Sequence, residues 1–250
     1  MAKTKKKAKR KLYFRILKKI MKVRYKEPRF VYLGERFDKG ALILSNHEGT
    51  DSPMSLEIYC DKHIRMWGSY EMNSGLAKLY KYQTEVYYHE KKHWNIHLAR
   101  LFCILASPLT MLFYSGFDLI STYKDIRFTK TIRESIRALN SGDNIVVFPE
   151  DSTNGYLAEL EGFHMGFVLL ADICLRRGMD IPIYVSYFKK GDPKRLIVGQ
   201  MISLKELFDN QRSRDEVAQL LCDECNGLGA KLLSEENGKT DVDRKNAAIG

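Results

Sequence analysis

The chain has 250 residues, of which 44% are hydrophobic and 11% aromatic. This apolar content excludes general disorder, and the length predicts one large domain with a substantial core. The net charge of +10 is concentrated in residues 1–26, which hold 13 lysines and arginines and no acid, so the other 224 residues carry a net charge of about −3. The basic character therefore predicts an anionic partner for the N-terminal segment alone.

Residues 1–30 are predicted to form a basic, amphipathic, membrane-associating segment. From Lys11 onward, basic residues alternate with apolar residues at helical spacing, namely Leu12, Phe14, Ile16, Leu17, Ile20, Met21 and Val23. Such a helix is typical of proteins that lie on an anionic membrane, here as a peripheral or monotopic protein at the cytoplasmic face of the cell membrane. Nucleic acid is not expected as a partner, because few aromatic side chains accompany the basic ones. Within this N-terminal segment, no uncharged stretch is long enough for a signal peptide.

Residues 31–235 are predicted to form an α/β domain, with a three-layer sheet flanked by helices. Short β-rich runs predict strands at 41–44, 63–68, 117–122, 144–148, 181–188 and 196–201. Helices are predicted near 53–59, 131–139, 160–177 and from Ser213 to Ser234, with capping boxes at Thr131/Glu134 and Ser213/Glu216. Residues 236–250 are polar and aperiodic, which predicts a disordered tail.

The segment from Leu101 to Phe117 contains seventeen residues without a charge. It is short for a membrane span, and Pro108 is expected to interrupt a helix there. Two interpretations remain open. The segment is either a buried hairpin of two helices or a monotopic element that enters one leaflet.

The five cysteines, at positions 60, 103, 174, 222 and 225, have no framework spacing. Reduced thiols in a cytosolic compartment are therefore predicted. Cys222 and Cys225 form one isolated pair, without the second pair that a zinc site needs. Neither a metal nor a cofactor is expected, and the sequence says nothing of the oligomeric state.

Two polar blocks, each directly after an apolar run, contain the candidate site residues. The first runs from Ser45 to Asp51 and the second from Val147 to Thr153, with the sequences Ser-Asn-His-Glu-Gly-Thr-Asp and Val-Phe-Pro-Glu-Asp-Ser-Thr. Each apolar run has the length of a buried strand, and polar residues at such strand ends are where α/β folds place their sites.

These blocks resemble the glycerolipid acyltransferases typified by lysophosphatidic acid acyltransferase. The first block of that family reads Asn-His-x4-Asp and the third Phe-Pro-Glu-Gly-Thr-Arg, and here Asn46-His47, Phe148-Pro149-Glu150, Gly166 and Pro182 match. The resemblance covers about 41–201. It implies transfer of a fatty acyl group from a thioester, acyl-CoA or acyl carrier protein, to the hydroxyl of a lysophospholipid-like acceptor in membrane lipid biosynthesis.

The resemblance also implies site roles. His47 would be the general base and Asp51 would orient it, since a neutral imidazole can take a hydroxyl proton at neutral pH. Asn46, Glu150, Ser152 and Thr153 would line the substrate site.

Two departures from the family pattern affect these roles. The His-x3-Asp spacing is one residue short, and Ser52 occupies the usual carboxylate position. Asp151-Ser152-Thr153 replaces Gly-Thr-Arg, so the arginine that suits a phosphate is missing. Lys124 or Arg127 would then supply the positive charge, and an acceptor other than plain lysophosphatidate is expected.

Two further expectations concern residues outside the blocks, and a third concerns the function as a whole. Tyr156, Phe163 and His164 are predicted to pack and not to act in catalysis. His89-Glu90-Lys91-Lys92-His93 fits the His-Glu-x-x-His pattern of zinc peptidases, which is kept as an alternative function. The other alternative is a catalytically weakened or inactive lipid-binding member of the acyltransferase fold.

Overall fold

The computed structural model describes residues 12–151, 155–209 and 212–247, with the backbone alone for residues 235–247. The strands are β1 (Arg29–Tyr32), β2 (Leu42–Ser45), β3 (Ile64–Ser69), β4 (Ile120–Thr122), β5 (Asn144–Val147), β6 (Pro182–Lys189) and β7 (Arg195–Ser203). The α-helices are α1 (Leu12–Arg24), α2 (Asp51–Tyr59), α3 (Leu76–Lys81), α4 (Ile96–Tyr114), α5 (Phe128–Asn140), α6 (Gly166–Arg176), α7 (Leu204–Phe208) and α8 (Arg214–Ala247). A 3₁₀ turn η1 (Tyr70–Asn73) and a π-helix η2 (Tyr82–Lys91) complete the described elements.

The strands form one seven-stranded sheet in the order β1-β7-β6-β2-β5-β3-β4. Strands β6, β2, β5, β3 and β4 run parallel, while β7 is antiparallel to β6 and parallel to β1. The predicted α/β class is therefore confirmed, and the six predicted strands all appear, with β1 as an additional edge strand that the sequence analysis did not predict.

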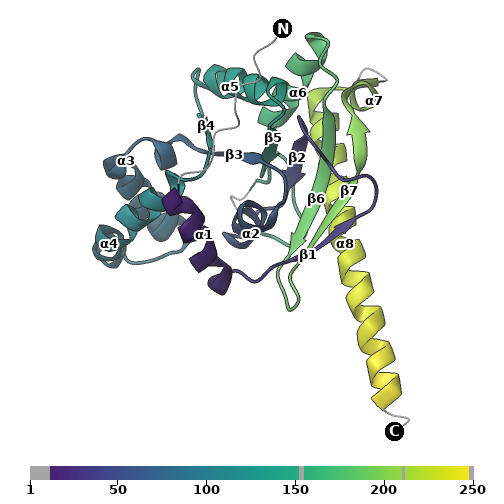
Figure 1. Cartoon of the computed structure of the whole chain (residues 1–250), viewed down its shortest axis with the longest axis horizontal. Coiled ribbons are helices and arrows are strands. Elements are labelled where there is room, and N and C mark those ends of the chain that lie inside the picture. The colour runs from purple at the N-terminus through teal and green to yellow at the C-terminus, as the bar shows by residue number, and fades with distance from the viewer. Residues whose placement is uncertain (1–11, 152–154, 210–211, 248–250) are drawn as a thin grey trace.

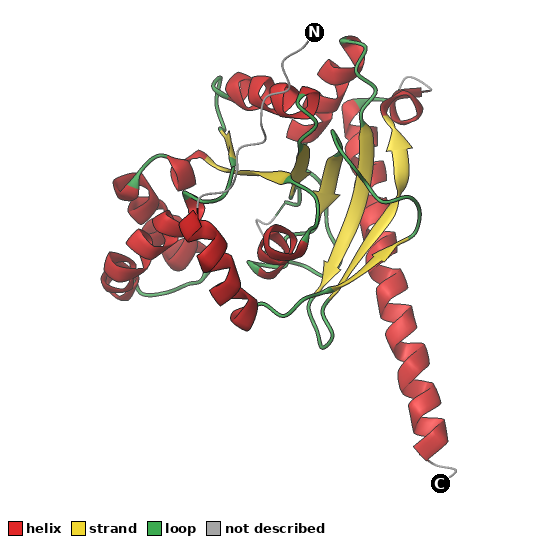
Figure 2. Ribbon diagram, viewed as in Figure 1, coloured by secondary structure: helices red, strands yellow, loops and turns green. Residues whose placement is uncertain are grey.

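Helices cover both faces of this sheet (Figures 1 and 2). Successive side chains of a strand point to opposite faces, so Leu42 and Leu44 join one core cluster and Ile43 joins the other. The first cluster includes side chains of α5, α6 and α8, and the second includes side chains of α1 and α2. The central strands are therefore buried on both sides, which explains their continuous apolar runs.

Helix α4 shows that the interpretation of its segment as a buried hairpin of two helices is wrong, whereas the monotopic interpretation stays a prediction. It is one continuous helix from Ile96 to Tyr114 with Pro108 inside it. Its side toward the protein carries Ala99, Cys103 and Ser107, which are buried, whereas many of its large apolar side chains are exposed. By length and composition alone, this helix is long and apolar enough to cross a membrane.

The C-terminal helix is longer than predicted. The capping box at its start is confirmed, because the Ser213 hydroxyl accepts from the N–H of Glu216 (3.2 Å) and the Glu216 carboxylate accepts from the N–H of Ser213 (2.7 Å). Helix α8 then continues through Ala247, in place of the disordered tail predicted from residue 236. Figure 1 shows its last turns projecting away from the sheet.

Candidate functional site

The sheet brings the two sequence blocks together. Strands β2 and β5 are parallel neighbours, with Leu44 paired to Val147. His47 and Glu150 each lie three residues beyond this pair, so both side chains leave the sheet at the same carboxyl-terminal edge. In parallel α/β sheets this edge is where binding sites form.

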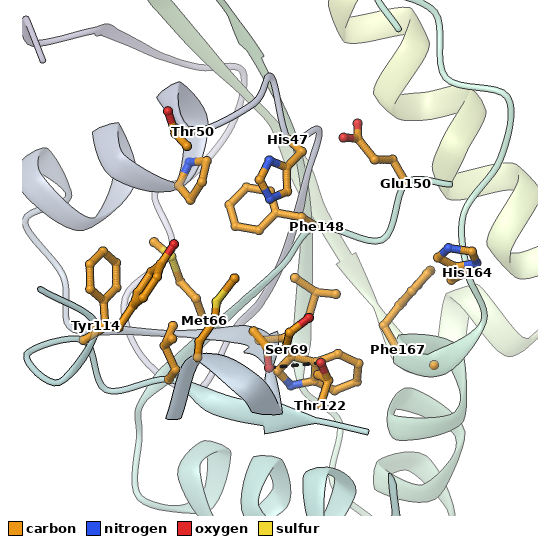
Figure 3. Close-up of a pocket in the computed structure, with 18 of the residues that line it drawn as sticks. His47, Thr50, Met66, Ser69, Tyr114, Thr122, Phe148, Glu150, His164 and Phe167 are labelled. Carbon is orange, nitrogen blue, oxygen red and sulfur yellow. Dashed lines mark hydrogen bonds between the residues drawn. The ribbon is translucent and has the colours of Figure 1, made fainter. Parts of the chain in front are cut away.

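A cavity of about 370 Å³ opens beneath these two residues. Its walls are mainly apolar and come from several elements. The apolar lining residues include Met54, Met66, Trp67, Met72, Phe117, Leu119, Phe128 and Phe167. Figure 3 shows His47 and Glu150 along one rim, with Met66 and Phe167 on the opposite side. An apolar cleft with a few convergent polar groups is the usual form of a small-molecule site.

His47 lies between two aromatic rings. Its imidazole stacks on Tyr156, with ring centroids 4.9 Å apart, and tilts against Phe148 at 5.0 Å. Burial lowers the pKa of His47 to about 4, although contacts with the backbone of Gly49 oppose the shift. The imidazole is therefore neutral at pH 7, and its Nδ1 has no hydrogen-bond partner among the described residues.

The pKa of Glu150 is shifted in the opposite direction to that of His47. Burial raises the pKa of Glu150 to about 7, and a hydrogen bond from the backbone N–H of His47 opposes that shift. Its Oε1 is buried without a hydrogen-bond partner in the described part of the chain. It is also the one carboxylate among the described residues that line the cavity. The site thus places a neutral imidazole beside a carboxyl group that is partly ionised at neutral pH.

The predicted pairing of His47 with Asp51 is wrong. The Asp51 carboxylate accepts a short hydrogen bond from Lys194 and lies 3.4 Å from Nζ of Lys190. Burial opposes ionisation of Asp51, but these two ammonium groups outweigh it and hold the pKa of the carboxyl below its usual range.

The reason is the shortened spacing. Helix α2 begins at Asp51, and one residue along a helix rotates a side chain by about 100°. Ser52 therefore stands on the side of the helix where the family's His-x4-Asp spacing would place the aspartate. Its Oγ is buried without a hydrogen-bond partner among the residues that the structure describes.

Asn46 has a structural role instead of the predicted contact with substrate. Its Nδ2 donates to the carbonyl of Phe188 (2.9 Å), and its Oδ1 accepts from the N–H of Phe188 (2.6 Å). The side chain is buried and joins the end of β2 to β6. Asn46 therefore positions the loop that carries His47.

The remaining predicted substrate contacts divide into three cases. Lys124 lines a second, polar groove next to the cavity. Arg127 does not take part, because Asp125 holds its guanidinium at 2.6 to 3.0 Å and the rings of Tyr70 and Tyr123 lie against it. Ser152 and Thr153 lie outside the described residues.

Tyr156 is a site residue that the sequence analysis assigned to packing. It belongs to an excursion of the chain after β5, which closes where Glu150 bridges Phe163. Two anchors hold this excursion, since Tyr187 donates to the carbonyl of Ala158 (2.6 Å) and Asn226 exchanges two hydrogen bonds with the backbone of Leu160. No sequence signal identifies Tyr156, because its position depends on these distant contacts.

The other two residues assigned to packing differ from each other. Phe163 is buried in the core, 6.0 Å from the ring of Phe167, so that prediction is confirmed. His164 instead lines both the apolar cavity and the polar groove. Its backbone N–H donates to the carbonyl of Pro149 (2.7 Å), which places it beside the Phe-Pro-Glu block.

The geometry does not favour the zinc alternative. His89 and Glu90 lie on the π-helix η2, but His93 lies beyond its end, in a left-handed backbone conformation with φ of 55°. Nδ1 of His89 is 2.8 Å from the carbonyl oxygen of Trp94. No group of three histidine, cysteine or acidic residues in the described part of the chain is arranged to hold a metal ion.

Neither a scan against protein-family models nor a search of curated proteins finds a match to this chain. The acyltransferase interpretation therefore depends on the residues and geometry of the site itself.

Proposed function

We propose that this protein is a membrane-associated O-acyltransferase that moves a fatty acyl group from a thioester to the hydroxyl of a lysophospholipid-like acceptor. The observation that carries the proposal is a neutral histidine and a carboxyl group at the rim of an apolar cavity. The cavity offers an apolar surface for an acyl chain, and the two polar groups lie where the reacting carbonyl and hydroxyl would meet. The donor would be acyl-CoA or an acyl carrier protein.

In the proposed reaction, His47 takes the proton of the acceptor hydroxyl as its oxygen attacks the thioester carbonyl. The new C–O bond forms, the tetrahedral intermediate collapses with loss of the C–S bond, and His47 returns the proton to the departing thiolate. Glu150 in its ionised form would accept a hydrogen bond from the acceptor and stabilise the imidazolium. The carboxylate role that the sequence assigns to Asp51 thus passes, in this proposal, to Glu150.

Two exposed apolar helix faces support the membrane part of the proposal. Helix α4 presents exposed leucines at helical spacing, namely Leu98, Leu101, Leu105, Leu109 and Leu112, and α1 presents Leu12, Ile16, Ile20 and Val23. The two helices meet, because Tyr13 and Ser115 are hydrogen-bonded at 2.7 Å and Phe14 packs on Phe113. Exposed basic residues of α1 fit an anionic bilayer. Residues 1–11, which hold much of the predicted basic segment, lie outside the described residues.

Acyl transfer from labelled palmitoyl thioester into a mixture of lysolipids tests the proposal, with coenzyme A and carrier-protein conjugates as donors. We expect labelled product with the wild type, a loss of at least a hundredfold in His47→Ala, and little change in His97→Ala, an exposed histidine outside the cavity. Asp51→Asn should keep the mechanism because Asp51 does not contact His47, although the loss of its ion pairs lowers stability. Full activity in His47→Ala would contradict the proposal.

A second candidate function, a lipid-binding protein without turnover, is favoured by one observation. Asp51 is held by lysines, so the hydrogen-bonded carboxylate that usually raises the basicity of a catalytic histidine is not on Nδ1. This candidate predicts that lysolipid binds while neither donor yields product.

A further inference from the structure

The apolar cavity continues into a polar groove of about 800 Å³. Lys91, Tyr156 and His164 line both spaces, so a ligand in the groove would lie next to His47. The other groove residues are Tyr87, Glu90, Lys92, His93, Lys124, Asp151 and Gly155, with no aliphatic side chain among the described lining residues. The two spaces together can therefore hold a ligand with an apolar part and a polar part.

The basic groups of the groove come from separate elements. Lys91 ends η2 and Lys92 follows it, while Lys124 comes from the loop between β4 and α5. Lysines at the end of a helix are often explained by the helix dipole alone. That explanation does not account for Lys124, which the tertiary fold brings to the same groove. The lysines outnumber the two acids, Glu90 and Asp151, among the described lining residues.

Lys91 is the lysine that lines both the cavity and the groove. It is the one lysine among the described residues that line the apolar cavity. Its charge lowers the pKa of His47 and also that of Glu150, although burial is the larger influence on each group. A cation that acts on both groups lies within reach of a substrate bound between them.

We propose that Lys91, assisted by Lys92 and Lys124, binds a phosphate group of the substrate beside His47. This inference rests on the proposed function and deepens it. It supplies, from η2 and the β4–α5 loop, the positive charge that the sequence lacks after Phe148-Pro149-Glu150. A lysine ammonium binds phosphate as a point charge and needs no planar fork. The phosphate belongs either to the acyl donor, whose carrier arm is a phosphate ester, or to the acceptor lysolipid.

Calorimetric titration of the full chain distinguishes these sources. The ligands are coenzyme A, a short-chain lysophosphatidate below its micelle concentration, and the matching neutral monoacylglycerol. We expect Lys91→Ala to weaken binding of a phosphate ligand about tenfold or more, with no change for monoacylglycerol. Lys91→Arg should restore most of the affinity, and Lys130→Ala, an exposed lysine of α5 outside the groove, should behave as wild type.

A loss confined to coenzyme A would assign the phosphate to the donor, and a loss confined to lysophosphatidate would assign it to the acceptor. The proposal is overturned if the wild type binds neither phosphate, or if Lys91→Ala binds both as tightly as the wild type does. It is also overturned if Lys91→Ala loses affinity for monoacylglycerol by the same factor as for the phosphate ligands, since that indicates a structural effect. Phosphate binding without acyl transfer would contradict the proposed function alone, whereas transfer that is insensitive to Lys91 would contradict this inference alone.

Discussion

At the scale of single residues, the site is defined by two groups whose pKa values move in opposite directions. Burial removes both from water, which disfavours the charged form of each group, so the pKa of His47 falls to about 4 and that of Glu150 rises to about 7. Each shift makes a stability contribution that depends on pH. Both shifts cost stability, but the two costs change with pH in opposite directions, so their pH slopes nearly cancel between about pH 4.5 and 6.5.

The signs follow from the protons bound in each state. Between about pH 4 and 6.5 the unfolded chain protonates His47 and the native protein does not, so stability from this group is lost as pH falls. Between about pH 4.5 and 7 the native protein protonates Glu150 and the unfolded chain does not, so stability from this group is lost as pH rises.

We therefore predict that single substitutions reveal how each group makes the unfolding free energy depend on pH. Going from pH 7 to pH 5, Glu150→Gln should lose about 2 kcal/mol of unfolding free energy relative to wild type, and His47→Asn should gain about 2 kcal/mol. Urea unfolding at the two pH values measures both. Parallel pH dependence in the wild type and both variants would show that these groups are not shifted.

The sequence predicted the residues His47 and Glu150 but not the partner of His47. A one-residue difference in spacing is visible in the sequence, and its consequence depends on where helix α2 begins. Because Asp51 is the first residue of α2 and Lys194 lies beside it, the carboxylate binds lysine and not imidazole. Lys194 is 143 residues away in sequence, so no local pattern identifies this contact.

At the scale of elements, a buried aromatic side chain and an ion pair are among the contacts that attach α1 to the domain. Phe14 is fully buried, with ring centroids 5.7 Å from Phe113 and 5.6 Å from Phe117. Lys18 bonds to Glu57 of α2, at 2.7 Å to the buried carboxylate. Gly116 permits this arrangement, because a Cβ there would lie 2.0 Å from Cδ2 of Phe14.

Gly116→Ala should therefore destabilise the protein by about 1–3 kcal/mol, since the added methyl group overlaps a fully buried ring. Gly227→Ala is the matched control. Gly227 is exposed within α8, and a Cβ there meets no atom within 4 Å, so this change should stabilise by about 0.5–1 kcal/mol through helix propensity. Urea midpoints measure both changes. Equal midpoints for the two variants would refute the packing role of Gly116.

The two predicted capping boxes show why element boundaries are only partly predictable. Ser213 and Glu216 form theirs, but Thr131 lies within α5 and donates to the carbonyl of Ser121 (2.7 Å). Helix α5 starts earlier because Asp125 accepts from the N–H of Arg127 (2.8 Å), which is an alternative way to begin a helix. The same local pattern thus has two outcomes, and the tertiary contact decides between them.

At the scale of the whole molecule, apolar side chains gather away from the core. The exposed leucines of α4 belong to the group of helices at one end of the sheet, whereas α8 lies at the other end (Figure 1). Single exposed apolar residues are common on soluble proteins, but a continuous helix face of them is typical of a contact surface. In the proposed function that surface meets the bilayer.

Leu105→Glu should reduce binding to anionic vesicles about tenfold or more, because Leu105 is 76% exposed and would lose its place in the lipid. Leu233→Glu, on α8 and 47% exposed, serves as the control and should bind as wild type does. Vesicle cosedimentation measures both, with phosphatidylglycerol-containing and purely zwitterionic vesicles. Equal binding by the two variants would remove α4 from the membrane surface.

The sequence by itself determined the α/β class, the strands of the sheet centre and the two polar blocks, because apolar runs and strand-end motifs are local patterns. It also determined the amphipathic character of α1. Only the tertiary structure decided that Glu150 and His47 share a rim, that Tyr156 stacks on the imidazole, and that Lys91 reaches the site while Arg127 does not. These outcomes depend on contacts between segments far apart in the chain, and such contacts leave no periodic signal in the sequence.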